Sequence, residues 1–255
     1  MSDFEIYALK YAGPLVRTGA HLMWYRDWDK TETINYYIFC IKGAGETVVV
    51  DAGLTLKLAK QRQLDGYVSP DEVLSRIDVK AAEVRHVIVT HMHFDHANGV
   101  SLFPQATFYV QEDEYRFWVT DPVATRPPFK EVSDADANAY LAALEGTNRL
   151  SLLKGDQEVI PGIQCLLAPG HTVGLQAVAV DTAKGTAILG SDCAHVFRNY
   201  REDWPSALIV DLVGWMKTYD KLRARASSPD LLFPGHDRRL LENYPEVAED
   251  VARLV

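Results

Sequence analysis

The sequence has few cysteines, no long apolar run and no excess of positive charge. Its three scattered cysteines, Cys40, Cys165 and Cys193, cannot form a disulfide framework, and their odd number indicates a reducing compartment such as the cytoplasm. No stretch approaches the ~18 consecutive apolar residues of a transmembrane helix, so no membrane association is expected. The first residues lack a basic region followed by an apolar segment, which predicts no secretory signal. A net charge of -9 argues against a nucleic-acid partner.

The rest of the composition is that of an ordinary folded protein. Among the 255 residues, 47% are hydrophobic and 24% are charged, which excludes disorder as the main state. No Pro-, Ser- or Gly-rich linker and no block of like charges divides the chain. We therefore predict one domain spanning residues 1–255.

Short apolar runs rich in β-branched residues recur along the chain and end in the same way. Uninterrupted apolar runs of this length are typical of strands that are buried on both faces. Each run leads into a loop that carries an Asp or a His near its start. The runs and the polar residues after them are Thr47–Val50 with Asp51, Val87–Thr90 with His91, Cys165–Leu167 with His171, Ala187–Gly190 with Asp192, and Leu231–Phe233 with His236.

Helical patterns lie between these predicted strands. Predicted helices begin at Ser69–Pro70, cover Ala137–Leu144 and Leu208–Leu222, and include a last one that opens at Pro245 and carries Val247, Val251 and Leu254. Met23–Lys30 and the proline-containing segment Thr120–Glu131 are expected to be irregular loops. Strands alternating with helices predict a layered α/β fold with the helices outside the sheets.

A dense group of potential metal ligands follows the second of these strands. His91, His93, Asp95 and His96 lie within six consecutive residues, a density that a chain with 8 histidines rarely produces by chance. His171, Asp192 and His236 stand at equivalent strand ends. If these strands share a direction, their ends form one rim, where the functional loops of α/β proteins gather.

These motifs together resemble the metallo-β-lactamase superfamily. The His-x-His-x-Asp-His signature is present at residues 91–96, the later motifs follow it, and Asp51 matches an acid that commonly follows an early strand; the resemblance runs roughly from Ile34 to His236. It implies a four-layered αβ/βα sandwich. It also implies one metal ion held by His91, His93 and His171, a second held by Asp95, His96 and His236, and Asp192 bridging the two.

Imidazole and carboxylate ligands without thiolates favour Zn²⁺, with Mn²⁺, Fe²⁺ or Co²⁺ as alternatives. Two such ions can share a water, lower its pKa and polarise a carbonyl oxygen, so the expected reaction is hydrolysis by a metal-bridged hydroxide. Asp95 is expected to take part in catalysis as well as ligation. Asp51 either orients a ligand histidine or is a turn acid. A protein with a structural metal and no catalysis is the competing class.

Within the superfamily, the chain resembles the N-acyl homoserine lactonase branch. Its size and the motif Phe233–Asp237 agree with that branch, which implies a small lactone as substrate and a homodimer as the oligomeric state. A small amide or an aryl ester is the alternative substrate. These lactonases usually carry a Tyr three residues after the bridging Asp, and here that residue is His195. We predict that His195 contacts the substrate as a hydrogen-bond donor; the alternative is a histidine facing solvent or stacked on Phe197.

Aromatic and sulfur-containing side chains are candidates for a partly apolar substrate pocket. The alternative for each is ordinary packing. His21 and His86 are assigned to structure, and Cys193 is expected to pack rather than bind metal. The candidates for substrate contact are Met23, Trp24, Tyr25, Trp28, Phe129 and Phe197.

Overall fold

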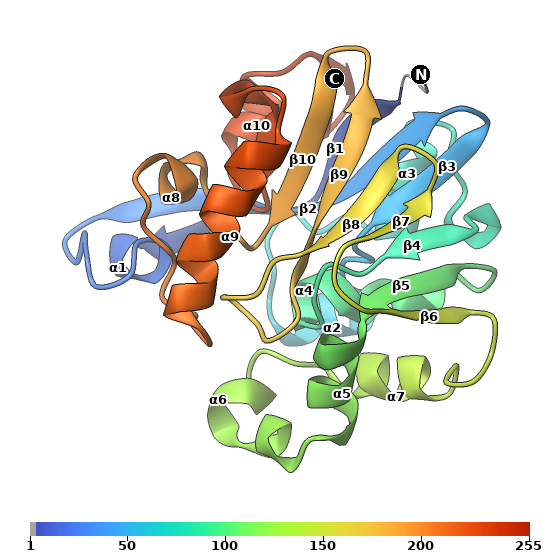
Figure 1. The fold of residues 1–255 in the computed structure, drawn as a ribbon, viewed down its shortest axis with the longest axis horizontal. Helices are drawn as coiled ribbons and strands as arrows, with labels where there is room; N and C mark the ends of the chain where they lie inside the picture. The colour runs from blue at the N-terminus through green and yellow to red at the C-terminus, as the bar shows by residue number, and fades with distance from the viewer. Residues whose placement is uncertain (1–3) are drawn as a thin grey trace.

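Two β-sheets packed face to face form the centre of the computed structural model, which describes residues 4–255 (Figure 1). Within those residues, eight strands form the first sheet and five form the second. The first sheet has the order β12 (Glu246–Ala248), β13 (Val251–Arg253), β1 (Glu5–Thr18), β2 (Thr31–Gly43), β3 (Glu46–Val50), β4 (His86–Ile88), β5 (Thr107–Gln111) and β6 (Leu150–Leu153). The second has the order β11 (Leu232–Pro234), β10 (Gly185–Ser191), β9 (Gln176–Thr182), β8 (Ile163–Leu167) and β7 (Gln157–Ile160).

Helices cover the outer faces of both sheets, so the predicted four-layered αβ/βα sandwich is confirmed. Figure 1 shows α9 alongside β10, and α5 and α7 below β5 and β6. The α-helices are α1 (Gly19–Leu22), α2 (Leu56–Gln61), α3 (Pro70–Ser75), α4 (Phe94–Ala97), α5 (Glu112–Thr120), α6 (Pro127–Lys130), α7 (Ala135–Ala142), α8 (Phe197–Arg201), α9 (Leu212–Arg225) and α10 (Arg239–Glu242). Single 3₁₀ turns are η1 (Ala81–Glu83), η2 (Asn98–Leu102), η3 (Pro122–Thr125) and η4 (Pro229–Leu231).

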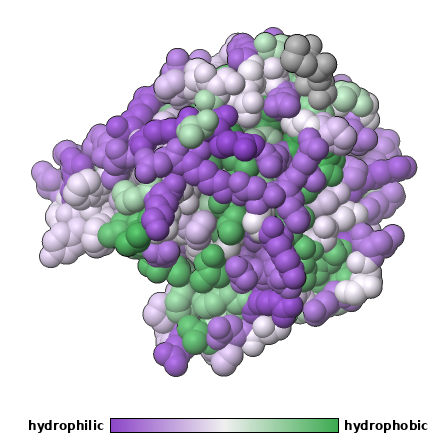
Figure 2. Space-filling model, viewed as in Figure 1, coloured by the Kyte–Doolittle hydropathy of each residue, from purple (hydrophilic) through white to green (hydrophobic). Residues whose placement is uncertain are grey.

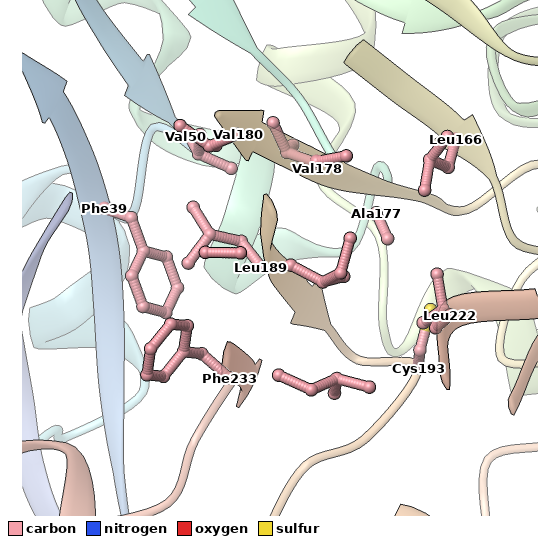
Figure 3. Packing of buried hydrophobic residues seen from close by; sticks show 14 of the residues in the cluster. Phe39, Val50, Leu166, Ala177, Val178, Val180, Leu189, Cys193, Leu222 and Phe233 are labelled. Atoms are coloured by element: carbon pink, nitrogen blue, oxygen red, sulfur yellow. The ribbon is translucent and has the colours of Figure 1, made fainter. Parts of the chain in front are cut away.

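Side chains that alternate along β2 contribute to two hydrophobic layers, one between the two sheets and one between the first sheet and its helices. Phe39 and Ile41 point into the layer between the sheets, whereas Ile38 and Cys40 point into the layer under the helices. Because successive side chains of a strand face opposite sides, one strand serves two cores. Figure 3 shows Phe39 and Phe233 meeting between the sheets, next to Leu189.

The outer surface contrasts with these cores. Hydrophilic side chains cover much of the upper part of the face in Figure 2, with hydrophobic surface in smaller areas below. Among residues 4–255, no helix has both the length and the apolar character needed to span a bilayer.

All five apolar runs form strands, but one predicted helix begins two residues earlier than expected and another begins four residues later. The second helix begins at Ala135, with the Asp134 carboxylate accepting the Ala137 amide at 2.8 Å. The predicted Leu208–Leu222 helix begins at Leu212, because Asp211 caps it by accepting the Gly214 amide. In both cases an Asp immediately before the helix satisfies an amide of its first turn.

The predicted last helix is wrong. The segment after Pro245 forms β12 and β13, and Val251 pairs with Leu9 of β1. Asp250 adopts a positive φ of 59° in the two-residue turn between these strands. Pairing with the edge of a long strand therefore outweighs the helical spacing of the apolar residues.

The loop prediction for Thr120–Glu131 is also wrong in part. Two short helical pieces, η3 and α6, occupy this segment, and each has a proline in its first turn. Proline is favoured there because its ring fixes φ and no amide hydrogen is needed. The segment Met23–Lys30 is irregular, as predicted, with positive φ at Tyr25 and Asp27.

Candidate metal centre

The candidate site lies where strand ends of the two sheets meet. β8 and β10 both run antiparallel to β9, and β10 runs parallel to β11, so these three strands end on one side. His91 follows β4 of the other sheet. Thr90 joins the two sheets, since its carbonyl accepts the Gln176 amide at 2.9 Å and its hydroxyl lies 2.8 Å from Ser191 Oγ. The predicted rim is therefore present.

All seven predicted ligand residues are buried and come together at this rim. Their nitrogen and oxygen atoms form overlapping groups in which every atom lies within 4.8 Å of the others. A fourth group includes His195. The groups are His91, His93 and His171; His91, His96 and Asp192; Asp95, His96 and His236; and His171, Asp192 and His195.

The short helix α4 explains how four ligand-type residues fit into six positions. His91 and His93 are in extended chain, where alternate residues face the same side, and their rings lie 4.6 Å apart. The chain turns at His93, and Asp95 and His96 fall in the first turn of α4. The change from extended to helical geometry brings the His96 ring to 4.1 Å from the His91 ring.

Gly235 allows the last turn to approach Asp192. A Cβ on this residue would lie 2.7 Å from Asp192 Oδ1, closer than packed atoms allow. Only glycine fits there without a shift of the carboxylate. The Pro-Gly-His spacing thus places His236 next to Asp192.

Three of the imidazoles are fixed from behind through Nδ1. His96 Nδ1 lies 2.7 Å from Asp51 Oδ2, and the backbone carbonyls of Leu208 and Asn35 lie 2.9 Å and 3.0 Å from Nδ1 of His171 and His236. Such contacts fix the tautomer and direct Nε2 forward.

Asp51 connects this support to the strand before the ligand loop. Its Oδ1 accepts the Thr90 amide at 2.8 Å while its Oδ2 faces His96. Asp51 therefore lies behind the cluster and contacts one of its histidines, in addition to ending its own strand.

The unpaired atoms at the centre fit divalent cations. Nε2 of His91 and Nε2 of His96 are buried and have no hydrogen-bond partner among residues 4–255. Burial, together with the neighbouring His96 and His93, holds the pKa of His91 well below its usual value. A neutral imidazole with a free nitrogen is the form that binds a metal ion.

Carboxylates reverse the balance at His96. Burial alone would lower its pKa, but Asp51, Asp192 and Asp95 outweigh that effect and raise the pKa well above the usual value. The carboxyl of Asp192 responds in the opposite direction: burial raises its pKa, but His195, His236 and His96 hold it well below the ordinary range. The Asp192 carboxylate therefore stays anionic among the imidazoles of the cluster.

His195 faces the cluster. Its Nε2 lies 3.2 Å from Asp192 Oδ2, its ring lies 5.0 Å from that of His171, and only 4% of the residue is exposed. Burial lowers its pKa well below the usual value. The solvent-facing alternative is therefore excluded, and Phe197 packs on Tyr200 instead.

A cavity of about 290 Å³ opens over the cluster. None of the six predicted substrate-contact residues lines it: Met23 is buried in the protein, Tyr25 and Trp28 are 75% and 68% exposed, and Phe129 packs on Phe117. The residues lining the cavity are Arg17, His21, Ile34, Tyr36, Arg62, His93, Phe94, Asp95, Glu131, Val132, Asp192, His195, Leu208 and His236.

The two histidines assigned to structure differ in position. His86 Nδ1 lies 2.9 Å from the Tyr109 hydroxyl, remote from the cluster. His21 lines the cavity, with its ring 6.5 Å from that of His195. Cys193 is buried beside Asp192 and belongs to none of the ligand groups.

Glu114, which no sequence motif marks, connects two of the ligand loops. Its Oε1 accepts the Met92 amide at 2.9 Å and the Trp118 indole N–H at 2.7 Å. Its Oε2 accepts the Thr172 hydroxyl at 2.7 Å and the Gly174 amide at 2.9 Å. Burial raises its pKa despite these four donors. The carboxylate ties the loop of His91 and His93 to the loop of His171.

Comparisons with known proteins agree with this geometry. An N-acyl homoserine lactonase of Bacillus cereus is 27% identical over 136 residues, which are 53% of this chain and 48% of that protein. One from Rhizobium rhizogenes is 28% identical over 176 residues, 66% of this chain and 62% of that protein. The matched region thus spans about half to three-fifths of these relatives.

Solved structures extend the likeness in fold to nearly the whole chain. A structure of N-acyl homoserine lactone hydrolase with N-hexanoyl-L-homoserine bound at its catalytic metal centre superimposes with a TM-score of 0.78, at 20% identity, covering 97% of this chain and 98% of that one. A dizinc quorum-quenching lactonase superimposes with a TM-score of 0.73, at 16% identity, covering 92% and 88%. The family model described as the metallo-beta-lactamase superfamily matches residues 30–236, and with the His/Asp cluster it implies divalent metal ions. The chain belongs to the metallo-β-lactamase superfamily.

Proposed function

We propose that the protein is a hydrolase with two divalent metal ions that opens a small lactone. His91, His93 and His171 would hold one ion, and Asp95, His96 and His236 would hold the other, as the grouping of their side-chain atoms supports. Zn²⁺ is the favoured metal, because the ligands are imidazoles and carboxylates in a compact site; Mn²⁺, Fe²⁺ and Co²⁺ suit the same donors.

The position of Asp192 between the two groups carries this proposal. Its Oδ2 lies 3.4 Å from His171 Nε2 and 3.8 Å from His91 Nε2, whereas its Oδ1 lies 2.9 Å from His236 Nε2 and 3.4 Å from His96 Nε2. Each carboxylate oxygen therefore faces a different set of histidines. This is the arrangement that a bridging carboxylate needs.

When bound, the two ions would supply an activated water and polarise the carbonyl oxygen of the substrate. In the proposed reaction, the oxygen of water bonds to the acyl carbon and the ring C–O bond breaks, giving a hydroxy acid. Asp95, whose carboxylate lies at the cavity, takes the proton from the attacking water and delivers it to the leaving alkoxide. His195 is placed to donate a hydrogen bond to the substrate carbonyl or leaving oxygen.

The direct test combines elemental analysis with a substrate panel. Metal-replete protein should contain about two metal ions per chain. It should open acyl homoserine lactones or simple γ- and δ-lactones, and lose this activity on chelation. Turnover of only aryl amides or aryl esters would replace the lactonase proposal by the alternative substrate class. Metal binding without hydrolysis of any substrate would favour a structural site.

Three wider proposals accompany this one. We propose that residues 1–255 act as a single domain, supported by the hydrophobic layer that the two sheets share. The buried, unpaired thiols of Cys40, Cys165 and Cys193 support a reducing compartment such as the cytoplasm. The exposed side chains of Tyr25 and Trp28 support a homodimer, which sedimentation would test.

A further inference from the structure

Two arginines line the cavity above the metal centre without a carboxylate partner. Arg17 is half-buried near the end of β1, and Arg62 follows α2. No carboxylate of residues 4–255 lies within 4.0 Å of either guanidinium. The acid that faces Arg17 across the strands is Glu32, and it pairs with Arg198 at 2.7 Å. In a chain of net charge -9, two unpaired cations at one cavity need an explanation.

An aromatic wall holds both guanidiniums in place. Arg17 Nη2 donates to the Tyr36 hydroxyl at 3.0 Å, and the Tyr36 ring lies 6.4 Å from the Phe94 ring. The Arg62 guanidinium lies 3.5 Å from the centre of that same Phe94 ring, and its Nη2 donates to the Glu131 carbonyl at 2.9 Å. We call Arg17, Tyr36, Phe94 and Arg62 the arginine wall; all four line the cavity.

Most donors of these guanidiniums are free. Each guanidinium has five N–H groups in a planar fork. Arg17 uses one for Tyr36 and one for its neighbouring carbonyl, that of Val16, while Arg62 uses one for the Glu131 carbonyl. The free edges match a carboxylate in shape and charge better than any neutral group.

The wall adjoins the reacting centre. The Tyr36 ring packs edge-on against the ring of His236, a proposed ligand, at 5.3 Å between centroids. Only the Tyr36 ring therefore separates a group bound by Arg17 from the proposed ligand His236. This short separation suits a small substrate in a cavity of about 290 Å³. Glu131 also lines the cavity and opposes an anion there.

We propose that this site selects lactones that carry a carboxylate on the ring or on a short substituent, and that Arg17, with Arg62, binds that carboxylate. The inference rests on the proposed lactonase activity and names its substrate class. Acyl homoserine lactones, which lack such a group, would be poor substrates by comparison.

A matched pair of substrates tests this directly. 5-Oxotetrahydrofuran-2-carboxylate and its carboxamide share one lactone ring and nearly one shape, but only the first is charged. The metal-loaded protein should open the carboxylate with a kcat/KM at least about tenfold higher, as expected for a hydrogen bond to a charged group. Arg17→Met should lower kcat/KM for the carboxylate by roughly 10- to 100-fold and that for the carboxamide by less than about threefold.

Two further variants serve as controls, one expected to increase the preference for the carboxylate and one expected to leave it unchanged. Glu131→Gln removes the opposing charge and should raise kcat/KM for the carboxylate alone, by roughly two- to fivefold. Arg126→Met removes an exposed arginine outside the cavity and should leave the preference unchanged. Metal content and Tm are measured for each variant, and Arg62→Met decides the question if Arg17→Met does not fold.

The outcomes separate the two proposals. If no lactone is opened, neither these two nor any of the substrate panel, the proposed function is wrong. If acyl homoserine lactones are opened but the carboxylate lactone is not, the arginine wall does not select a carboxylate. If the carboxamide is opened as well as the carboxylate, or if Arg17→Met slows both equally, the arginine wall does not select charge, although the lactonase proposal stands.

Discussion

The seven proposed ligands, which we call the floor, are held differently from the arginine wall. Four of them, His93, Asp95, Asp192 and His236, line the cavity. Behind the floor, a carboxylate or a carbonyl contacts Nδ1 of His96, His171 and His236. In the wall, Arg17 donates to the Tyr36 hydroxyl and the Val16 carbonyl, and Arg62 donates to the Glu131 carbonyl and packs on Phe94. Tyr36 and Phe94 connect the wall to the ligands, but the hydrogen bonds of Arg17 and Arg62 go to other residues, so either arginine can be replaced without removing a contact that supports a ligand histidine.

His195 lines the cavity beside Asp192 and gives the largest expected effect. His195→Ala should keep both metal ions, because the other seven residues complete the two sets. Its kcat/KM should fall roughly ten- to a thousandfold, the range for losing one proton donor or oxyanion-type contact. Elemental analysis together with kcat/KM from pH 6 to 9 measures both quantities. Full metal content with unchanged kcat/KM would show that His195 has no part in the reaction.

Asp51 tests whether the support behind the floor controls the metal. Asp51→Asn keeps the shape but weakens the contact to His96 Nδ1, so metal affinity should fall by roughly 10- to 100-fold. Competition with a chromogenic chelator measures this. Asp136→Asn neutralises an exposed aspartate paired with Lys57 and serves as the control. Equal affinities in the two variants would make Asp51 only a turn acid.

Glu114 tests how much the connection between the two ligand loops contributes to the stability of the fold. In Glu114→Gln one carboxylate oxygen becomes an NH₂ group that faces two donors, so stability should fall by about 2–4 kcal/mol. Thermal unfolding measures this as a lower Tm, by roughly 2–4 °C per kcal/mol for a chain of this size. Glu112→Gln, on the same helix, weakens the ion pairs of Glu112 with the exposed side chains of Arg116 and Lys154 and should cost less than about 1 kcal/mol. A Tm drop no larger than that of the control would show that Glu114 does not stabilise the fold by tying the two ligand loops together.

The floor could be predicted from the sequence because its signals are local. His91, His93 and His96 lie within one loop after a recognisable strand, and His171 and His236 repeat a Pro-Gly-His turn. Strand ends that share a direction then bring these loops together without further information.

The arginine wall could not be predicted in the same way. Arg17 reaches Tyr36 because two long strands, β1 and β2, pair with register shifts between them. No motif encodes that register. Glu114 could not be predicted for a similar reason. Two of its partners, Thr172 and Gly174, lie 58 and 60 residues away in the sequence, and a third is the amide of Met92. The segment after Pro245 became strands because the edge of β1 was available for pairing.

The smallest expected effect concerns the aromatic loop that the sequence suggested for substrate contact. Trp28 is 68% exposed, lies outside the cavity and packs edge-on against Tyr25 at 5.5 Å. Trp28→Ala should therefore change kcat/KM for any lactone by less than about twofold and stability by no more than about 0.5 kcal/mol, as for other surface substitutions. Kinetics on the matched carboxylate and carboxamide lactones, measured well below and well above the concentration at which the chains associate, provide the check. A large loss of kcat/KM at every protein concentration would place Trp28 against the substrate after all. A loss confined to dilute protein would instead assign the aromatic loop to an interface between two chains, because dilution changes association but not the contacts within one chain.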